Sequence, residues 1–506
     1  MIVRLALRSL ATRPLRTAVL SIGFGLGIAV MAELLGVGEV ILQQAHSPAL
    51  SGGGDVVVTG GFGALESARF VLSSVLASDR FRSRLRAVAP SRKATLYLIG
   101  RDETTPVAVR GGIPSRDAAI GDPEVAAQTA WTDTADDTRW LNPEPGDVLR
   151  AMDRFHSFDS RVAPHARGRL AAAEPAGVDE TSWAEWLYFN GRSQDGALRF
   201  YLTFLATAPD RSAARRTYVR LQLNRNGVTT SYSALANVDE RALLDRAPDL
   251  DVAGNRIRLD SSGQYRITLV LGRERAAGPK GPALLGDIRG PGPFGRGDVA
   301  RAGVHGDLTL TPAPGRSFPP AAIHGARGWM SGYVVPVLSG TWSGRLVTEG
   351  KAIAVDGAPG YHDHNWGFWE GVSWQWGQVA NGDLSIVYGR VFPPADVADR
   401  NRVPGALAVV GRDGLIAFSN DVSIAEDDQN GTPQTVTVRS RSRQLTLLLR
   451  LTVSESVRTP MALTQGRTSQ AAATFLQLGG VYQVNGRAGD LDLNFTARGS
   501  AETFRY

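Results

Sequence analysis

The side chains best suited to chemistry are concentrated in one short stretch of the chain, residues 360–377. It reads Gly-Tyr-His-Asp-His-Asn-Trp-Gly-Phe-Trp over 360–369 and Trp-Gln-Trp-Gly over 374–377, and it holds four of the ten tryptophans. Polar groups buried unpaired beside indole rings would cost about 1–3 kcal/mol each, so they must bond to one another or serve a site. In an extended strand, alternation separates them into two faces: Tyr361, Asp363 and Asn365 on one, and His362, His364 and Trp366 on the other.

Two interpretations of this stretch require no substrate. His362 and His364 on one strand face are two potential metal ligands, and a third, from His156 or Glu185, would be needed to complete a site. In the second, structural interpretation, the polar groups of the cluster hydrogen-bond to one another and hold the junction of two domains together.

The composition excludes several classes of function. The 506 residues are 43% hydrophobic and 21% charged, which is typical of a folded protein. The absence of cysteine excludes disulfides, thiolate metal sites and a cysteine nucleophile. Only three of the 55 basic residues are lysine, and the arginines are spread along the chain with acids beside them. We therefore expect no nucleic acid partner.

The elements that must position the stretch are predicted to be short strands. From about residue 180, apolar residues alternate in runs separated by turn signals. Asn226-Gly227, between runs at 217–224 and 229–234, is the strongest hairpin signal. About 330 residues of such runs are too many for one barrel, so the fold class is mainly β with two antiparallel barrels. The expected organisation is a membrane anchor at 1–45, a small α+β segment at 46–114, a linker at 115–150, and barrels at 151–340 and 341–506.

The N-terminus predicts a membrane helix. Arginines at positions 4, 8, 13 and 16 precede an apolar run from Thr17 to Gly38 that is broken only by Glu33. A spanning helix needs about 20 such residues, and its arginine flank stays in the cytoplasm. The bulk of the chain is then extracytoplasmic (periplasmic). A cleaved signal peptide ending near Ala32 and a buried core helix are the alternatives.

Two family resemblances follow from these motifs. Leu-Ala-Leu-Arg-Ser-Leu at 5–10 and Arg-Pro-Leu-Arg-Thr at 13–17 look like the first membrane helix of MacB/FtsX-type ABC transporter permeases. The Tyr-His-Asp-His-Asn-Trp-Gly run resembles the carotenoid 1,2-hydratase (hydroxyneurosporene synthase, CrtC)/AttH-like family, over about 150–506. Asp-Arg-Phe-His at 153–156, Glu-Trp-Leu-Tyr-Phe-Asn-Gly at 185–191 and Gly-Tyr-Val-Val-Pro at 332–336 agree with it.

The second resemblance implies tandem lipocalin-like barrels that handle hydrophobic molecules. The hydratases use a Tyr-x-Asp pair to add water to a carotenoid alkene, and Tyr361 and Asp363 match it. Their upstream His-x-Trp pair has no match here, since 329–336 reads Trp-Met-Ser-Gly-Tyr-Val-Val-Pro. A carboxyl kept neutral by apolar walls can protonate an alkene, and indole faces can stabilise the cation, with no metal or organic cofactor.

Two functions remain open. One is a membrane-anchored protein that binds a lipid or isoprenoid and works with ABC transporter subunits. The alternative is a hydratase or cyclase that acts on an isoprenoid alkene by general acid catalysis. The expected catalytic residues are Asp363, Tyr361, His362 and His364, and the expected ligand-binding residues are Trp366, Trp369, Trp374, Trp376, Asn365, Tyr333, Trp186, Glu185, Tyr188 and His156.

Overall fold

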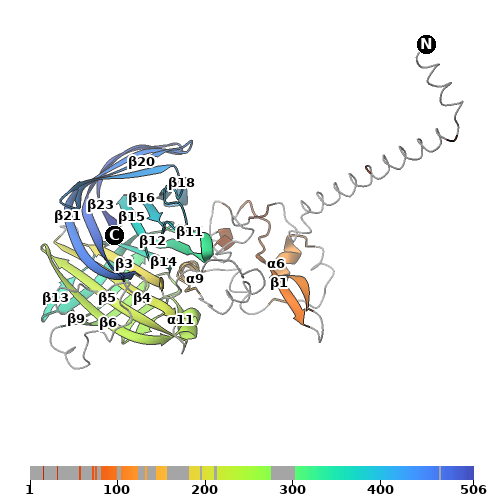
Figure 1. Ribbon diagram of the computed structural model, residues 1–506, viewed down its shortest axis with the longest axis horizontal. Coiled ribbons are helices and arrows are strands. Elements are labelled where there is room, and N and C mark those ends of the chain that lie inside the picture. The colour runs from red at the N-terminus through yellow and green to blue at the C-terminus, as the bar shows by residue number, and fades with distance from the viewer. Residues whose placement is uncertain are drawn as a thin grey trace, which may run out of the picture. The chain divides into compact units, whose positions relative to one another are not determined.

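The computed structural model describes residues 83–99, 104–122, 132–133, 144–156, 182–193, 197–209, 213–274, 303–465 and 469–505, with a few isolated positions before residue 83. The chain divides into two compact units, Met1–Ala68 with Phe81–Asn142, and Arg69–Arg80 with Pro143–Tyr506. Figure 1 labels their helices and strands.

The first unit contains a two-stranded antiparallel hairpin, β1 (Ser91–Ile99) and β2 (Thr104–Gly112), followed by the short helix α6 (Pro114–Ala119). Among the described residues, no helix is long and apolar enough to cross a membrane. The predicted span at 17–38 lies almost wholly outside the described residues. The predicted linker at 115–150 differs from the structure at its two ends, because both are helical.

A closed eight-stranded barrel forms the first part of the second unit. Its ladder runs in the order β10-β12-β14-β3-β4-β5-β6-β9, and pairing of β9 with β10 closes the ring. These strands are β3 (Trp183–Arg192), β4 (Leu198–Pro209), β5 (Ala214–Arg225), β6 (Val228–Asp239), β9 (Tyr265–Arg273), β10 (Val304–Pro312), β12 (Met330–Thr348) and β14 (Ala358–Phe368). The Asn226-Gly227 hairpin signal is confirmed, since both residues have positive φ and join β5 directly to β6.

Smaller elements belong to the same part of the chain as this barrel. They are β7 (Asp251–Val252), β8 (Asn255–Leu259), β11 (Phe318–His324), β13 (Lys351–Ala354), α9 (Pro145–Met152), α11 (Glu240–Arg246) and the short 3-10 turn Ala326–Gly328. Helix α9 begins with a capping box between Glu144 and Asp147, and its last residues pack into the barrel core. The helix thereby places Asp153 and Phe155, which follow it, in the barrel interior.

The second part is a nine-stranded antiparallel sheet with its own apolar core. Its order is β18-β17-β16-β15-β23-β22-β21-β20-β19, and Figure 1 shows how strongly it curls. The strands are β15 (Ser373–Asn381), β16 (Leu384–Phe392), β17 (Ala406–Gly411), β18 (Gly414–Ser419), β19 (Val422–Gln429), β20 (Thr432–Arg441), β21 (Leu445–Gln465), β22 (Ser469–Ala488) and β23 (Leu491–Arg505).

The second sheet is not the closed barrel that we expected. Its edge strands β18 and β19 are consecutive in the chain and joined by Asn420 and Asp421, yet no ladder pairs them within the described residues. The expected boundary at 340/341 also falls inside β12. The first barrel extends to Phe368 because β14 must return between β12 and β3 to complete the ring.

Gly367, the glycine that ends the Tyr-His-Asp-His-Asn-Trp-Gly run, is required by the backbone conformation there. Its φ is 142°, and a Cβ added there would lie 2.4 Å from the Met330 carbonyl oxygen. We expect Gly367→Ala to lower the free energy of unfolding by about 2 kcal/mol or more, measured by urea denaturation. Gly357→Ala is the control, because it shares a positive φ but has nothing within 4 Å of the added atom. Equal losses in the two variants would contradict the steric argument.

Candidate functional site

A cavity of about 600 Å3 lies between the closed barrel and the curled sheet. Aromatic side chains from both sheets contribute to its wall, among them Trp186, Tyr188, Tyr333, Trp369, Trp374 and Trp376. A seam of buried apolar residues from both sheets adjoins it. The aromatic wall suits an apolar molecule, because burying its surface contributes about 25 cal/mol per Å2.

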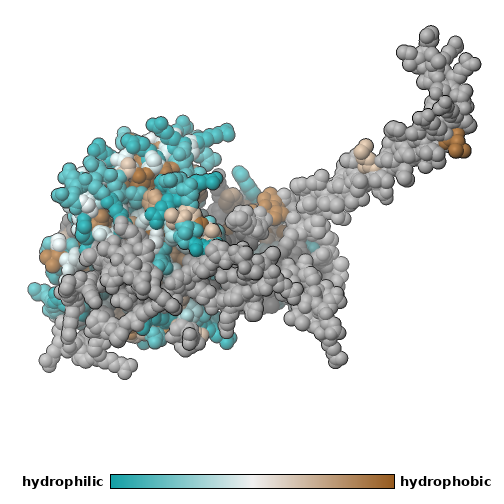
Figure 2. All heavy atoms as spheres, in the orientation of Figure 1, coloured by the Kyte–Doolittle hydropathy of each residue, from teal (hydrophilic) through white to brown (hydrophobic). Residues whose placement is uncertain are grey.

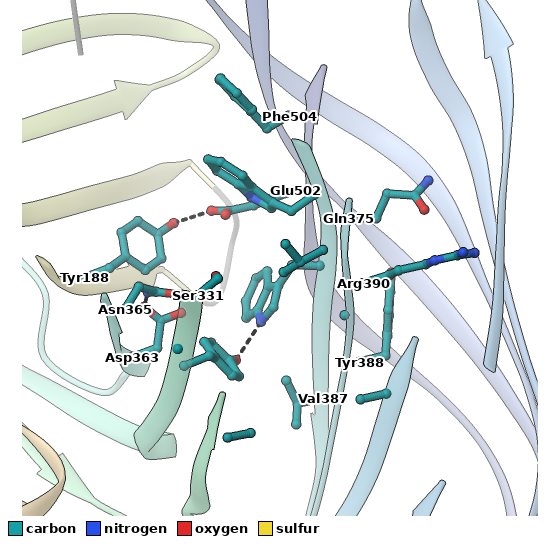
Figure 3. Close-up of a pocket in the computed structure, with 18 of the residues that line it drawn as sticks. Tyr188, Ser331, Asp363, Asn365, Gln375, Val387, Tyr388, Arg390, Glu502 and Phe504 are labelled. Atoms are coloured by element: carbon teal, nitrogen blue, oxygen red, sulfur yellow. Dashed lines mark hydrogen bonds between the residues drawn. The ribbon is translucent and has the colours of Figure 1, made fainter. Parts of the chain in front are cut away.

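Alternation along β14 decides which side chains reach the cavity. His362 and His364 face the barrel interior opposite Phe189 and Leu187 of β3, while Asp363 faces outward into the cavity. Figure 3 shows Asp363 and Asn365 among the side chains that line the cavity. The predicted division of this stretch into two faces is therefore present in the structure.

The Asp363 carboxyl accepts two hydrogen bonds from its neighbours on the same face. The Tyr361 hydroxyl donates to Oδ2 at 2.8 Å, and the Asn365 amide donates to Oδ1 at 2.7 Å. Asp363 is 6% exposed and Tyr361 is fully buried. Both carboxyl oxygens are thus fixed in place, as a proton-transfer group requires.

A chain of donors leads to this carboxyl. The Trp376 indole donates to the Tyr333 hydroxyl at 2.8 Å, and Tyr333 lies 2.8 Å from the Tyr361 hydroxyl. An indole N–H can only donate a hydrogen bond, so the Tyr333 hydroxyl accepts from Trp376. Tyr333 can then donate its own hydroxyl hydrogen bond to Tyr361, which in turn donates to Asp363. This direction would stabilise a negative charge on Asp363 if the carboxyl lost its proton.

The surroundings of Asp363 favour the protonated form of its carboxyl. Burial raises the pKa of Asp363 well above its usual value, and the opposing hydrogen bond from Tyr361 does not offset it. A nearby carboxyl, Glu502, raises the pKa further. Burial therefore favours the protonated, neutral form of Asp363, in a cavity whose aromatic walls could stabilise a cation.

Glu502 was not predicted from the sequence. It lies on β23 opposite Trp376 and Gln477, and its side chain lines the cavity. The Tyr188 hydroxyl of the closed barrel donates to Glu502 Oε1 at 2.7 Å, so this bond joins the two sheets (Figure 3). Burial raises the pKa of Glu502 to about 7. The local sequence, Ala-Glu-Thr-Phe, carries no signal beyond an acid within a strand.

The histidines of the stretch belong to a different network, inside the barrel. His362 Nδ1 lies 3.0 Å from the Tyr188 carbonyl and its Nε2 3.0 Å from Asp153, which also accepts from the Tyr265 hydroxyl at 2.5 Å. His364 Nδ1 lies 3.0 Å from the Met152 carbonyl. Phe189 stacks on His362, with ring centroids 4.0 Å apart. These contacts tie β14 to the end of α9.

Glu185 is the centre of the second half of this network. His364 Nε2 lies 2.9 Å and His156 Nδ1 2.8 Å from its Oε1, and the buried Arg215 guanidinium donates to its Oε2 at 3.4 Å. Burial alone would raise the pKa of Glu185, but the hydrogen bonds from His156 and His364 outweigh it and lower the pKa to about 2. The same carboxylate raises the pKa of His364 against the effect of burial.

The ligand atoms of His156, Glu185 and His364 lie within 4.8 Å of one another, a spacing that could hold a metal ion. However, Glu185 already accepts from both imidazoles, from the His156 backbone N–H and from Arg215. The guanidinium would also repel a divalent cation beside it. The donor set fits a hydrogen-bonded ion network better than a metal centre.

The predicted site residues therefore separate into two groups. The cavity wall contains Asp363, Asn365, Tyr333, Trp186, Tyr188, Trp369, Trp374 and Trp376, with Tyr361 bonded directly behind Asp363. Five others lie outside the cavity lining, in or beside the barrel core: His362, His364, Trp366, Glu185 and His156. His156 stacks on Trp366 with ring centroids 4.2 Å apart.

Comparisons with known proteins give structural similarity at low identity. No protein-family model matches the chain, and no curated protein matches it. Among solved structures, it is similar to a Nitrosomonas europaea protein assigned as AttH, with 14% identity, a TM-score of 0.38, and coverage of 65% of this chain and 94% of that one. CghA with Sch210972 has 11% identity, a TM-score of 0.36, and coverage of 64% and 87%.

Kievitone hydratase from Nectria haematococca has 12% identity, a TM-score of 0.37, and coverage of 65% and 95%. AttH-type and hydratase proteins are thus among the structures that resemble this chain. The resemblance of the N-terminus to MacB/FtsX-type permeases has no support in these comparisons. At these identities and TM-scores, no function follows from the likeness.

Proposed function

We propose that this protein binds an apolar, alkene-bearing small molecule in the cavity and that Asp363 protonates it. The observation that carries the proposal is a buried carboxyl on an aromatic-lined cavity, with a pKa raised by that burial and with two donors placed to stabilise its conjugate base. Proton transfer from Asp363 to one alkene carbon leaves a positive charge on the other carbon of the double bond. The indole faces of Trp374 and Trp376 can stabilise that cation until water or a second alkene captures it.

An isoprenoid is the substrate class that best suits this chemistry. Trisubstituted alkenes of isoprenoids give tertiary cations, which form more readily than those of straight-chain lipids. Hydration and cyclisation are the corresponding reactions, and they differ only in whether water or a second alkene reaches the cation.

A carrier without catalysis is the second candidate function. It is favoured by the residues at 329–336, where the His-x-Trp pair of the resembled hydratases is absent. The membrane anchor, the extracytoplasmic location and an ABC transporter partner belong to this candidate. They rest on the arginine-flanked apolar run of the N-terminus.

The test begins with the purified protein. We expect organic extraction and mass spectrometry to recover an isoprenoid from it, and farnesol to quench its tryptophan fluorescence. In heavy water, we expect the protein to place deuterium on carbon in farnesol or squalene. Binding without deuterium incorporation would support the carrier, and failure to bind any apolar probe would contradict both functions.

A further inference from the structure

We infer that Glu502 is a second catalytic residue of this cavity, the base that accepts a proton from the molecule that Asp363 has protonated. The inference rests on the proposed function and deepens it, because it makes the reaction a paired transfer of two protons. It is carried by the placement of the two carboxyls, one from each sheet, on the same cavity.

The pairing of β23 with its neighbouring strands places the Glu502 side chain in the cavity wall. Its neighbours in the ladder, Trp376 on β15 and Gln477 on β22, also line the cavity, so this part of the curled sheet presents one continuous face to it. Tyr188 reaches across from β3 and fixes Glu502 Oε1. In Figure 3 a dashed line joins Tyr188 to Glu502, and Tyr188 is also the residue of β3 that lies opposite Asp363 in the ladder.

The charge around the two cavity carboxyls differs from that around the other buried acids. Glu185 pairs with Arg215 and two imidazoles, and Asp153 pairs with His362. In the part of the chain that the structure describes, no ion pair is formed by Asp363 or Glu502. Burying a carboxyl without a cationic partner lowers the stability of the fold, so a purely structural role does not explain these two carboxyls. Uncompensated acids in a cavity are typical of a working site.

The two environments also assign opposite roles. Burial raises the pKa of both carboxyls, but that of Glu502 only to about 7, because Tyr188, Gln477 and Trp374 donate hydrogen bonds to it. Near pH 7, Glu502 is therefore ionised in a large fraction of molecules, whereas burial favours the protonated form of Asp363. The Glu502 anion in turn raises the pKa of Asp363. Two carboxyls whose pKa values are separated in this way form an acid and a base.

The reaction balances with these two groups. Asp363 gives its proton to one alkene carbon, and the electron pair of the double bond forms the new C–H bond. The cation is then quenched when water adds and loses a proton to Glu502, or when Glu502 removes a proton from an adjacent carbon and a new double bond forms. The first route is a net addition of water and the second a net isomerisation. Afterwards, solvent returns one proton to Asp363 and takes one from Glu502.

The experiment uses 5-nitrobenzisoxazole, an apolar probe that opens when a base removes its C–H proton. The C–H electrons form a nitrile, the N–O bond breaks, and the coloured phenolate leaves, so no oxidant or cofactor is needed. We expect the full-length protein to accelerate this opening, with a rate that rises with pH through about 7 as Glu502 ionises. Farnesol should suppress the reaction by occupying the cavity.

Glu502→Gln is the decisive variant, because its amide oxygen can still accept the Tyr188 hydroxyl. We expect the probe reaction to fall about 100-fold or more and its pH dependence near 7 to disappear. Glu502→Asp should restore part of the rate together with the pH dependence. Asp492→Asn, which removes an exposed carboxyl from the same strand, is the matched control and should leave both unchanged.

An unchanged rate or pH profile in Glu502→Gln would overturn the role of Glu502, as would the absence of any probe reaction in the unmodified protein. Neither outcome bears on delivery of deuterium by Asp363, which is measured separately with farnesol. Conversely, the probe reaction could depend on Glu502 while no deuterium is delivered to farnesol. That result would support Glu502 as a base and contradict the proposed function.

Discussion

Replacing Asp363 by asparagine is expected to lower deuterium delivery to the alkene probe by about 100- to 10,000-fold, the usual contribution of a general acid. Asparagine keeps the size of the side chain and an oxygen that can accept from Tyr361, but it has no proton to give. Its amide nitrogen would face Asn365, whose own amide can turn to present oxygen instead. The fold should therefore be unaffected.

The measurement is the rate of deuterium incorporation into farnesol in heavy water, with thermal unfolding as a check on the fold. Asp492→Asn is again the matched control. Farnesol affinity, followed by tryptophan fluorescence, should change little because the aromatic wall is intact. Incorporation at the unmodified rate in Asp363→Asn would refute acid catalysis by this residue, and only the carrier would remain.

The largest effect on stability is expected from Glu185→Gln. This change leaves Arg215 buried with one fewer anionic partner and removes the negative charge that His156 and His364 share. Breaking a buried ion pair by removing one partner typically costs about 3–5 kcal/mol. Urea denaturation should show a loss of this size. Glu240→Gln is the control, because Glu240 also pairs with Arg215 but is partly exposed, so its loss should be smaller.

The loss of unfolding free energy caused by Glu185→Gln should depend on pH in a defined direction. The folded state lowers the pKa of Glu185 from 4.5 to about 2, so its contribution is present above pH 4.5 and disappears as pH falls towards 2. The folded state raises the pKa of His364 above 6.5, so its contribution is present below pH 6.5 and disappears as pH rises through the raised value. The difference between the two proteins should be largest between pH 4.5 and 6.5. A difference independent of pH would contradict the ion network.

Local periodicity in the sequence determined much of the architecture around the cavity. The two-residue period of a strand separates Asp363 from His362 and His364 wherever that strand lies. The Asn226-Gly227 turn specifies its own hairpin because both positions need positive φ. Four clustered indoles at 366–376 predicted an aromatic wall, and three of them, Trp369, Trp374 and Trp376, line the cavity, whereas Trp366 lies in the barrel core. Each of these inferences depends only on residues close together in the chain.

Contacts between distant segments decided the rest. Whether a face of β14 is core or cavity depends on closure of the first ring by β9 and β10, which puts His362, His364 and Glu185 inside and leaves Asp363 outside. Among the described residues no ladder joins the two edge strands of the second sheet, so the sheet stays open there, a long-range outcome that no local pattern expresses. Glu502 joins the site only because β23 lies beside β15 and Tyr188 reaches it from the other sheet. Strand alternation is local, whereas strand pairing and enclosure are properties of the whole fold.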